Sequence, residues 1–195
     1  SKARPLILRN NGIKTRYYAL DKNQKPTHTN AEISALAVDG LFDENFKKED
    51  MELLSCGTTS ADQIQPSHAS MVHGVLKPGK SIGINTSMGL CNAGMNALNY
   101  GFLSVKAGAT QNAICVGSER FSSWMTADKF NHEVENLKLL EEKPIVAFKR
   151  EFLRWMLSDG AGAFLLENKP REGAVNLKIE WIDFHSFAHE IEACM

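Results

Sequence analysis

The sequence has no excess of basic over acidic residues. In 195 residues, 22 Lys and Arg stand against 23 Asp and Glu, a formal net charge of -1. A protein that binds nucleic acid mainly through charge normally carries a basic excess, so we expect no nucleic-acid partner. The sequence also lacks an apolar run close to the ~18–20 residues that span a bilayer, and no apolar signal segment opens it. We therefore expect a cytoplasmic protein with no membrane partner.

Cysteine is also scarce, with four widely spaced residues: Cys56, Cys91, Cys115 and Cys194. They form no C-x-x-C pair and no zinc-ribbon spacing, which argues against a redox motif and a zinc site. Hydrophobic residues make up 43% of the chain, and a chain of this length can bury a core without disulfides. Cys56 and Cys115 lie in apolar runs, so we expect them to be small buried side chains.

Short apolar segments alternate with helical patterns along the chain. We expect strands over residues 51–57, 81–85, 112–117 and 160–167, and helices over 30–39, 66–76 and 91–106. Such alternation predicts an α/β fold with a mixed, mainly parallel sheet. Residues 121–152 are rich in charge and predict a helical insertion on the surface.

A fifth strand is predicted near the end of the chain. Val175, Leu177, Ile179 and Trp181 alternate with other residues, which is the two-residue period of a half-buried strand. Because no helical pattern separates this segment from the strand at 160–167, we expect the two strands to pair as a hairpin.

Cys91 lies at a predicted junction of strand, turn and helix, directly after the turn at 86–90. A cysteine at a helix N-terminus faces unpaired N–H groups and the positive end of the helix dipole. Both favour the thiolate, which is the nucleophilic form. From the spacing alone, Cys91 is either a nucleophile or a buried structural cysteine.

Four groups of motifs follow one another in the chain. They are NGIKTR at 11–16, LLSCGTTSA at 53–61 with PSHA at 66–69, VKAGA at 105–109 with VGSE at 116–119, and SDGAGA at 158–163. In this order they resemble the type III β-ketoacyl-acyl-carrier-protein synthases, whose motifs include T-G-I-x-x-R and G-D-G-A-G-A. The resemblance covers most of the chain other than 121–152, and it places Cys91 where this family keeps its acyl-accepting cysteine.

The resemblance implies a thiolase-like fold, each half of which is a five-stranded βαβαβαββ layer. It implies that Cys91 accepts an acyl group from a thioester, with its own backbone N–H as one oxyanion donor. A Claisen condensation with a malonyl or β-ketoacyl thioester would follow, in fatty-acid or polyketide-like biosynthesis. The resemblance implies no cofactor and no metal. It implies a homodimer that takes acyl groups from acyl carrier protein or coenzyme A.

The family places an active-site His and Asn in a C-terminal half, and no histidine of this chain has the matching context. We therefore expect residues 1–195 to be an N-terminal half-domain that lacks its first strand and the C-terminal half, and to be inactive in condensation by itself. The long 121–152 segment resembles the branch of ketosynthases that form dialkylresorcinols and cyclohexanediones. The alternative function is that of a non-catalytic partner subunit of an active ketosynthase.

Several further residues are candidates for substrate binding. Met88, Met95, Phe102 and Trp124 either line an acyl pocket or belong to an ordinary core. The Trp and Arg with which the family clamps the coenzyme A adenine are absent, since those positions hold Leu6 and Asn10. This departure favours acyl carrier protein as the donor.

The SDGAGA motif carries the structural candidates Asp159, Gly160 and Gly162. We interpret Asp159 as a residue that binds N–H groups of a tight glycine-rich turn, because the motif lacks the Lys and Ser or Thr of a phosphate loop. Glu119 either lines a pocket floor or forms a buried ion pair. His185 and His189 do not follow the H-E-x-x-H order, so they predict no metal site.

Overall fold

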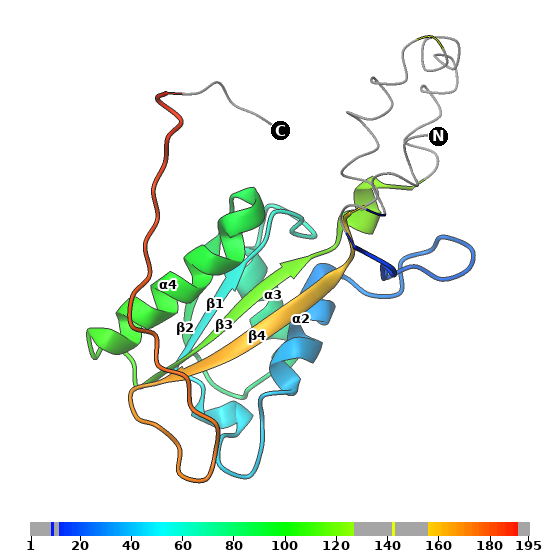
Figure 1. Cartoon of the computed structure of the whole chain (residues 1–195). Coiled ribbons are helices and arrows are strands. Elements are labelled where there is room, and N and C mark those ends of the chain that lie inside the picture. Colours follow the sequence, from blue (N-terminus) through cyan, green and yellow to red (C-terminus); the bar gives the residue numbers. More distant parts are fainter. Residues whose placement is uncertain (1–8, 10–11, 127–141, 143–155, 191–195) are drawn as a thin grey trace.

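The computed structural model describes residues 9, 12–126, 142 and 156–190. Within these residues, helices and short 3₁₀ turns alternate with the strands of one sheet (Figure 1). The elements are α2 (Asn30–Asp39), η1 (Lys48–Asp50), β1 (Leu53–Gly57), α3 (His68–Leu76), β2 (Gly83–Ser87), η2 (Leu90–Asn92), α4 (Ala93–Lys106), β3 (Asn112–Glu119), η3 (Phe121–Trp124) and β4 (Gly160–Glu167). None of the described helices is both long and apolar enough to cross a membrane.

The strands of the sheet follow the order β2-β1-β3-β4. Strand β1 pairs in parallel with both β2 and β3, and β4 runs antiparallel to β3. The predicted α/β fold with a mixed, mainly parallel sheet is therefore confirmed. Strand β2 begins at Gly83, later than the expected 81, and its register with β1 pairs Leu53 with Gly83 and Gly57 with Ser87.

The prediction of a fifth strand is wrong. The sheet has four strands, and residues 168–190 contribute none. They continue from β4 as an extended coil (Figure 1), in which Val175 is 94% and Trp181 78% exposed. A two-residue apolar period gives a half-buried strand only where another surface covers its apolar side. The described part of the chain supplies no such cover, and β4 pairs with β3 instead of forming the expected hairpin.

Most of the predicted insertion at 121–152 lies outside the described residues. Its first residues form η3, a single 3₁₀ turn at the end of β3. The expectation that the rest is helical stays a prediction.

Local signals explain where the helices begin and end. At α2, Thr29 Oγ1 accepts from the Glu32 N–H at 3.2 Å, and Thr29 N donates to the Glu32 carboxylate at 2.7 Å. This reciprocal pair is a capping box. Helix α3 begins after the N-cap residue Ser67, whose side chain accepts from the Ser70 N–H. Helix α4 ends before Gly108, which adopts a left-handed φ of 72° that glycine adopts without strain.

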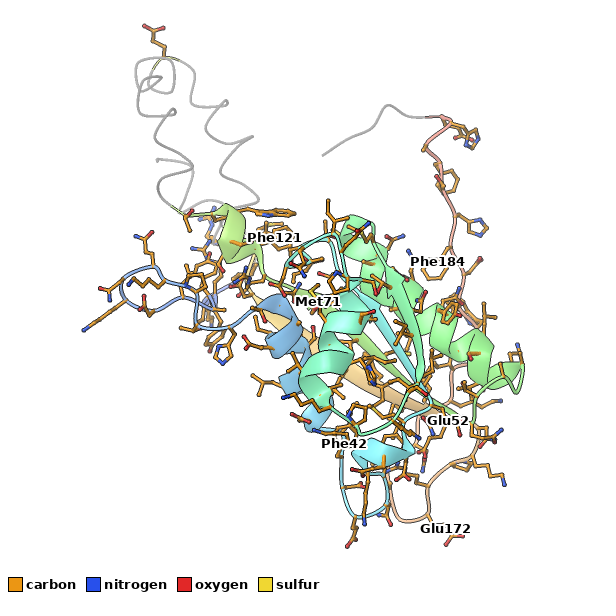
Figure 2. All side chains as sticks on the ribbon, turned by 180° about the vertical axis from the view of Figure 1, so that it is seen from behind. Phe42, Glu52, Met71, Phe121, Glu172 and Phe184 are labelled. Atoms are coloured by element: carbon orange, nitrogen blue, oxygen red, sulfur yellow. The ribbon has the colours of Figure 1, made fainter. Side chains whose placement is uncertain are left out.

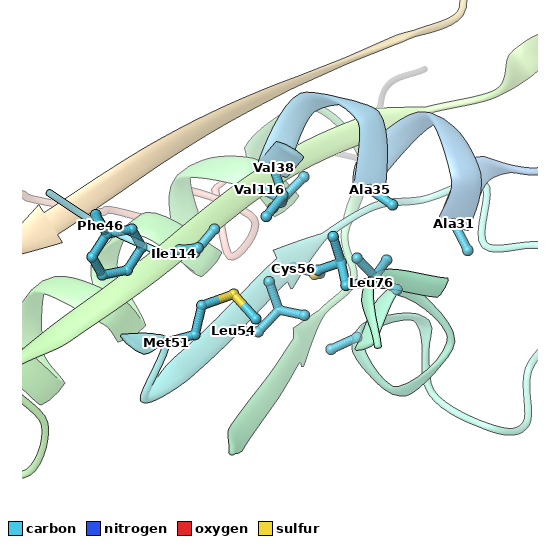
Figure 3. Close-up of a cluster of buried hydrophobic side chains, with 12 residues drawn as sticks. Ala31, Ala35, Val38, Phe46, Met51, Leu54, Cys56, Leu76, Ile114 and Val116 are labelled. Atoms are coloured by element: carbon cyan, nitrogen blue, oxygen red, sulfur yellow. The ribbon is translucent and has the colours of Figure 1, made fainter. Parts of the chain in front are cut away.

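Helices cover both faces of the sheet (Figure 1). On one face, α2 and α3 pack over the main buried cluster, to which the strands contribute Leu54, Ile114 and Val116 (Figure 3). On the other face, α4 packs over a smaller cluster that contains Ala113 and Cys115. The main core therefore lies under α2 and α3, while α4 rests on small side chains.

Helix α4 approaches the sheet closely enough for backbone to meet backbone. Its buried residues are Ala93, Ala97 and Gly101, which lie four positions apart and so form one narrow face. A Cβ at Gly57 of β1 would overlap the Ala93 carbonyl group, and a Cβ at Gly101 would overlap the Cys115 sulfur. Glycine at these two positions therefore allows an approach that any side chain would prevent.

Replacing Gly57 by alanine should destabilise the fold, because the new Cβ would meet main-chain atoms of α4. Overpacking of this kind lowers the free energy of unfolding by roughly 1–3 kcal/mol, and occasionally by more. The matched control is Gly74→Ala in α3, where a Cβ would meet no atom within 4 Å and alanine should stabilise the helix by roughly 0.5–1 kcal/mol. Urea unfolding of the two variants measures both effects. Equal stabilities would contradict the close approach.

His68 is a buried titratable residue in the first turn of α3. It is 1% exposed, and its Nε2 lies 3.2 Å from Ser34 Oγ of α2 and 3.1 Å from Ser118 Oγ of β3. Burial lowers the pKa of His68 below its ordinary value, and the nearby carboxylates of Asp62 and Glu119 oppose only part of that shift. The fold therefore favours the neutral imidazole.

The fold should consequently lose stability as the pH falls below about 6.5, the ordinary pKa of histidine. There the unfolded chain binds a proton that folded His68 does not, which favours unfolding; at higher pH both states are neutral and the effect vanishes. We expect His68→Gln to reduce the loss between about pH 7 and pH 5. Urea unfolding at several pH values measures it, with His73→Gln on the same helix as the control. A loss that is the same in His68→Gln as in the unchanged protein would rule His68 out as its source.

Candidate active site

Three loops meet at one edge of the sheet. The parallel strands β1, β2 and β3 end there, at Gly57, Ser87 and Glu119, and each is followed by a loop or a 3₁₀ turn. The carboxyl edge of parallel strands is the usual place for ligands in α/β sheets. Figure 2 shows Phe121 of η3 on the side of this edge and Glu52, which precedes β1, on the opposite side.

Cys91 lies among these loops. It is the middle residue of η2, directly before α4, and its side chain is exposed. The turn that leads to it passes through Gly89 at a φ of 132°, a conformation that other residues rarely adopt. Asn92, the N-cap residue of α4, makes no side-chain hydrogen bond to the helix. Cys91 thus lies beside the N-terminus of α4, where the first N–H groups of a helix have no intrahelical partner.

Cys56 and Cys115 differ from Cys91 in burial. Both belong to the core clusters, as the sequence predicted. Burial raises the pKa of the Cys115 thiol to about 12. Burial also raises the pKa of Cys56 well above its ordinary value, and the neighbouring Cys115 adds to this effect. Of these three cysteines, only Cys91 has the exposure that a nucleophile needs.

The residues considered for an acyl pocket lie on three segments. Met88 is in the turn before η2, Met95 and Phe102 are on α4, and Trp124 ends η3. Met95 and Phe102 are seven residues apart, so they share one face of the helix. Met88, Met95 and Trp124 are exposed, so these three are not core residues of the described part. A role in binding an acyl chain stays a prediction.

Asp159 binds N–H groups of two remote segments. Its carboxylate accepts from Ala19 N at 2.7 Å and from Ser122 N at 2.9 Å, and its own N–H donates to the Tyr17 carbonyl at 2.8 Å. Asp159 therefore joins the segment before α2 and the turn η3 to the start of β4.

Gly160 and Gly162 lie inside β4, and the glycine-rich turn expected around them does not form. Gly160 pairs with Glu119 and Gly162 with Gly117 of β3. A Cβ at either position in β4 would meet no atom within 4 Å. The described contacts therefore give no steric reason for glycine at these positions.

Asp62, which no sequence motif singled out, holds the loop after β1 in place. Its carboxylate accepts from the N–H groups of Asn30 and Ala31 at 2.8 and 2.9 Å, at the start of α2. It also forms an ion pair with Arg120 at 3.5 Å. A buried ion pair was one of the two roles expected for Glu119. Among the described ion pairs, none includes Glu119, and the neighbouring Arg120 pairs with Asp62 instead. The run T-T-S-A-D directly after an apolar strand is the signal that could have found this loop.

Comparison with known proteins gives both a sequence match and fold matches. No protein-family model matches the chain. In sequence, the chain is similar to the β-ketoacyl-[acyl-carrier-protein] synthase III of Clostridium perfringens, with 31% identity over 113 residues. That match covers 57% of this chain and 32% of the relative, so the matched segment spans about a third of the length of that protein.

Two solved structures have a similar fold at low sequence identity. The β-ketoacyl-[acyl-carrier-protein] synthase III of Thermus thermophilus has a TM-score of 0.57 and 22% identity, over 83% of this chain and 42% of its own. The tetronic acid condensing enzyme AbyA1 has a TM-score of 0.65 and 24% identity, over 87% of this chain and 47% of its own. The described part of the chain thus has the thiolase-like fold of condensing enzymes. Within that class, the predicted resemblance to the type III β-ketoacyl-acyl-carrier-protein synthases is confirmed over part of the chain.

Cys91 should react with iodoacetamide much faster than Cys56 and Cys115 in the folded protein. Its side chain is exposed, whereas the other two thiols react only after local unfolding, so we expect rates that differ by at least about a hundredfold. Peptide mass spectrometry over a time course measures the three rates, and labelling in denaturant provides the control in which they converge. Equally slow labelling of all three thiols would exclude Cys91 as a reactive cysteine.

Proposed function

We propose that this chain belongs to a condensing enzyme of the type III β-ketoacyl synthase kind, with Cys91 as the acyl-accepting nucleophile. The observation that carries the proposal is the exposed cysteine before α4, at the carboxyl edge of the sheet of a ketosynthase-like fold. The thiols of Cys56 and Cys115 are buried, and burial raises the pKa of both. Cys91 therefore has the surroundings that nucleophilic catalysis requires.

In the first step, the Cys91 thiolate attacks the carbonyl carbon of an acyl thioester. The tetrahedral oxyanion accepts hydrogen bonds from backbone N–H groups, including that of Cys91. The bond to the donor sulfur then breaks and the acyl group stays on Cys91 as a new thioester. The donor leaves as a thiolate and takes up the proton that the Cys91 thiol lost when it ionised.

In the second step, a malonyl thioester loses CO₂, or a β-ketoacyl thioester loses an α-proton, and either gives a carbanion. The carbanion attacks the acyl carbon, the new C–C bond forms, and the Cys91 thiolate is released. A covalent intermediate divides one difficult acyl transfer into two easier ones. In this proposal the groups that polarise the second thioester are an active-site His and Asn outside the present chain.

Acyl carrier protein is the proposed acyl donor, and a second copy of the protein is the proposed partner. The name of the Clostridium perfringens relative specifies acyl carrier protein, which supports this protein as a carrier of a thioester in the reaction. Leu6 and Asn10, which would replace the coenzyme A clamp, lie outside the described residues. Exposed apolar side chains on α4, among them Met95 and Leu103, suit further protein contact.

Intact-protein mass spectrometry of the natural gene product should show an acyl mass gain after incubation with acyl-carrier-protein thioesters. The gain should disappear in Cys91→Ser, because the hydroxyl is a far weaker nucleophile than a thiolate. It should persist in Cys194→Ser, the control that removes a cysteine elsewhere in the sequence. A folded protein that gains no mass from acyl-carrier-protein or coenzyme A donors would contradict the proposal and favour the non-catalytic partner subunit.

A further inference from the structure

The carboxylate of Glu119, the last residue of β3, binds the loop that follows β1. Its Oε1 accepts from Thr59 N at 2.8 Å, and its Oε2 accepts from Ser60 N at 3.0 Å and from Ser60 Oγ at 2.5 Å. A fourth donor, Thr58 Oγ1, lies 3.4 Å from Oε2. Hydrogen bonds to a charged acceptor are stronger than those between neutral groups. Glu119 therefore ties the ends of two neighbouring strands together.

The same loop is joined to the turn that carries Cys91. Thr58 N donates to the carbonyl of Ser87 at 3.1 Å, and Ser87 is the residue from which the turn to Cys91 starts. The loop after β1 is thus hydrogen-bonded to the residue at the end of β2.

The first turn of α4 packs against the ends of β1 and β3, close to this loop and this carboxylate. Gly57, which precedes Thr58, contacts Ala93, and a Cβ at Gly117 would lie 3.2 Å from the Cα of Gly94. Both strand ends that Glu119 connects therefore support the helix N-terminus next to Cys91. If these two strand ends move apart, the N-terminus of α4 loses the contacts that hold it against the sheet.

We infer that Glu119 is a positioning residue for the reaction of Cys91. Its carboxylate holds β1 and β3 at the spacing that seats the first turn of α4, and so fixes the cysteine and the neighbouring N–H groups relative to the acyl carbonyl. The inference rests on the proposed function, because it assigns Glu119 to acyl transfer at Cys91. A misplacement of about 1 Å at such a site can reduce a rate by about a hundredfold.

The test compares the acylation of Cys91 in Glu119→Gln, Ser60→Ala and Glu52→Gln, all made in the natural gene product. In Glu119→Gln, the amide NH₂ faces donors where an acceptor is needed, while Ser60→Ala removes one of the four donors. Glu52→Gln is the matched control: Glu52 Oε2 accepts from Gln111 N at 2.7 Å, so it is also a carboxylate that binds a loop N–H, but at the opposite edge of the sheet. The measurements are the maximal rate of acylation, the donor concentration that gives half of it, the rate of Cys91 alkylation by iodoacetamide, and the thermal midpoint.

We expect Glu119→Gln to lower the maximal acylation rate by about ten- to a hundredfold with little change in the half-saturating donor concentration. Ser60→Ala should give a smaller loss in the same direction, which keeps the test open if Glu119→Gln does not fold. Glu52→Gln should leave the acylation rate unchanged, even if it lowers the thermal midpoint as much as Glu119→Gln does. Wild-type acylation rates in both Glu119→Gln and Ser60→Ala would overturn the inference. A loss of acylation rate in Glu52→Gln as large as that in Glu119→Gln would also overturn it.

The alkylation rate separates this inference from the proposed function. A wild-type protein that accepts no acyl group refutes the proposed function. Alkylation of Cys91 still reports its placement in that case. A Glu119→Gln protein whose Cys91 reacts with iodoacetamide at the wild-type rate would then overturn the positioning role by itself.

Discussion

The candidate site depends on one constraint, the close packing of α4 against β1 and β3. Gly57 lets the main chain of β1 approach the main chain of α4, and Gly101 lets α4 approach the Cys115 sulfur. A Cβ at either glycine would overlap these atoms. Ser55 of β1 adds a buried hydrogen bond, because its Oγ donates to the Ala97 carbonyl at 2.8 Å. The helix N-terminus is thereby fixed at the carboxyl edge of the sheet, which brings Cys91 to the same edge and leaves its side chain exposed.

Polar contacts stabilise this edge where the apolar clusters do not. Asp62 caps the start of α2, Glu119 binds the loop after β1, and His68 bridges two serine hydroxyls. Buried polar groups of this kind stabilise a fold only when their partners are in place, because a lost partner leaves a desolvated group unsatisfied. Substitutions of these polar side chains should therefore cost more stability than substitutions in exposed loops.

The elements with strong local signals were predictable. The helices at 30–39 and 66–76 and the strand at 160–167 agree closely with α2, α3 and β4, because caps and periodicity act over a few residues. The fifth strand failed, since Val175 and Trp181 show the period of a strand but lie exposed in an extended coil. A period indicates which residues could share a face; only a neighbouring surface can bury that face.

The sequence by itself determined the α/β class, the resemblance to type III ketosynthases, the buried state of Cys56 and Cys115, and the placement of Cys91 before a helix. Those properties follow from local patterns and from motif order. Only the tertiary structure decided that Glu119 accepts hydrogen bonds from residues 58–60 and that Asp159 reaches Ala19 and Ser122. These contacts join residues far apart in the chain, so no local pattern specifies them. Their partners are set by strand order and register, which arise when the sheet assembles.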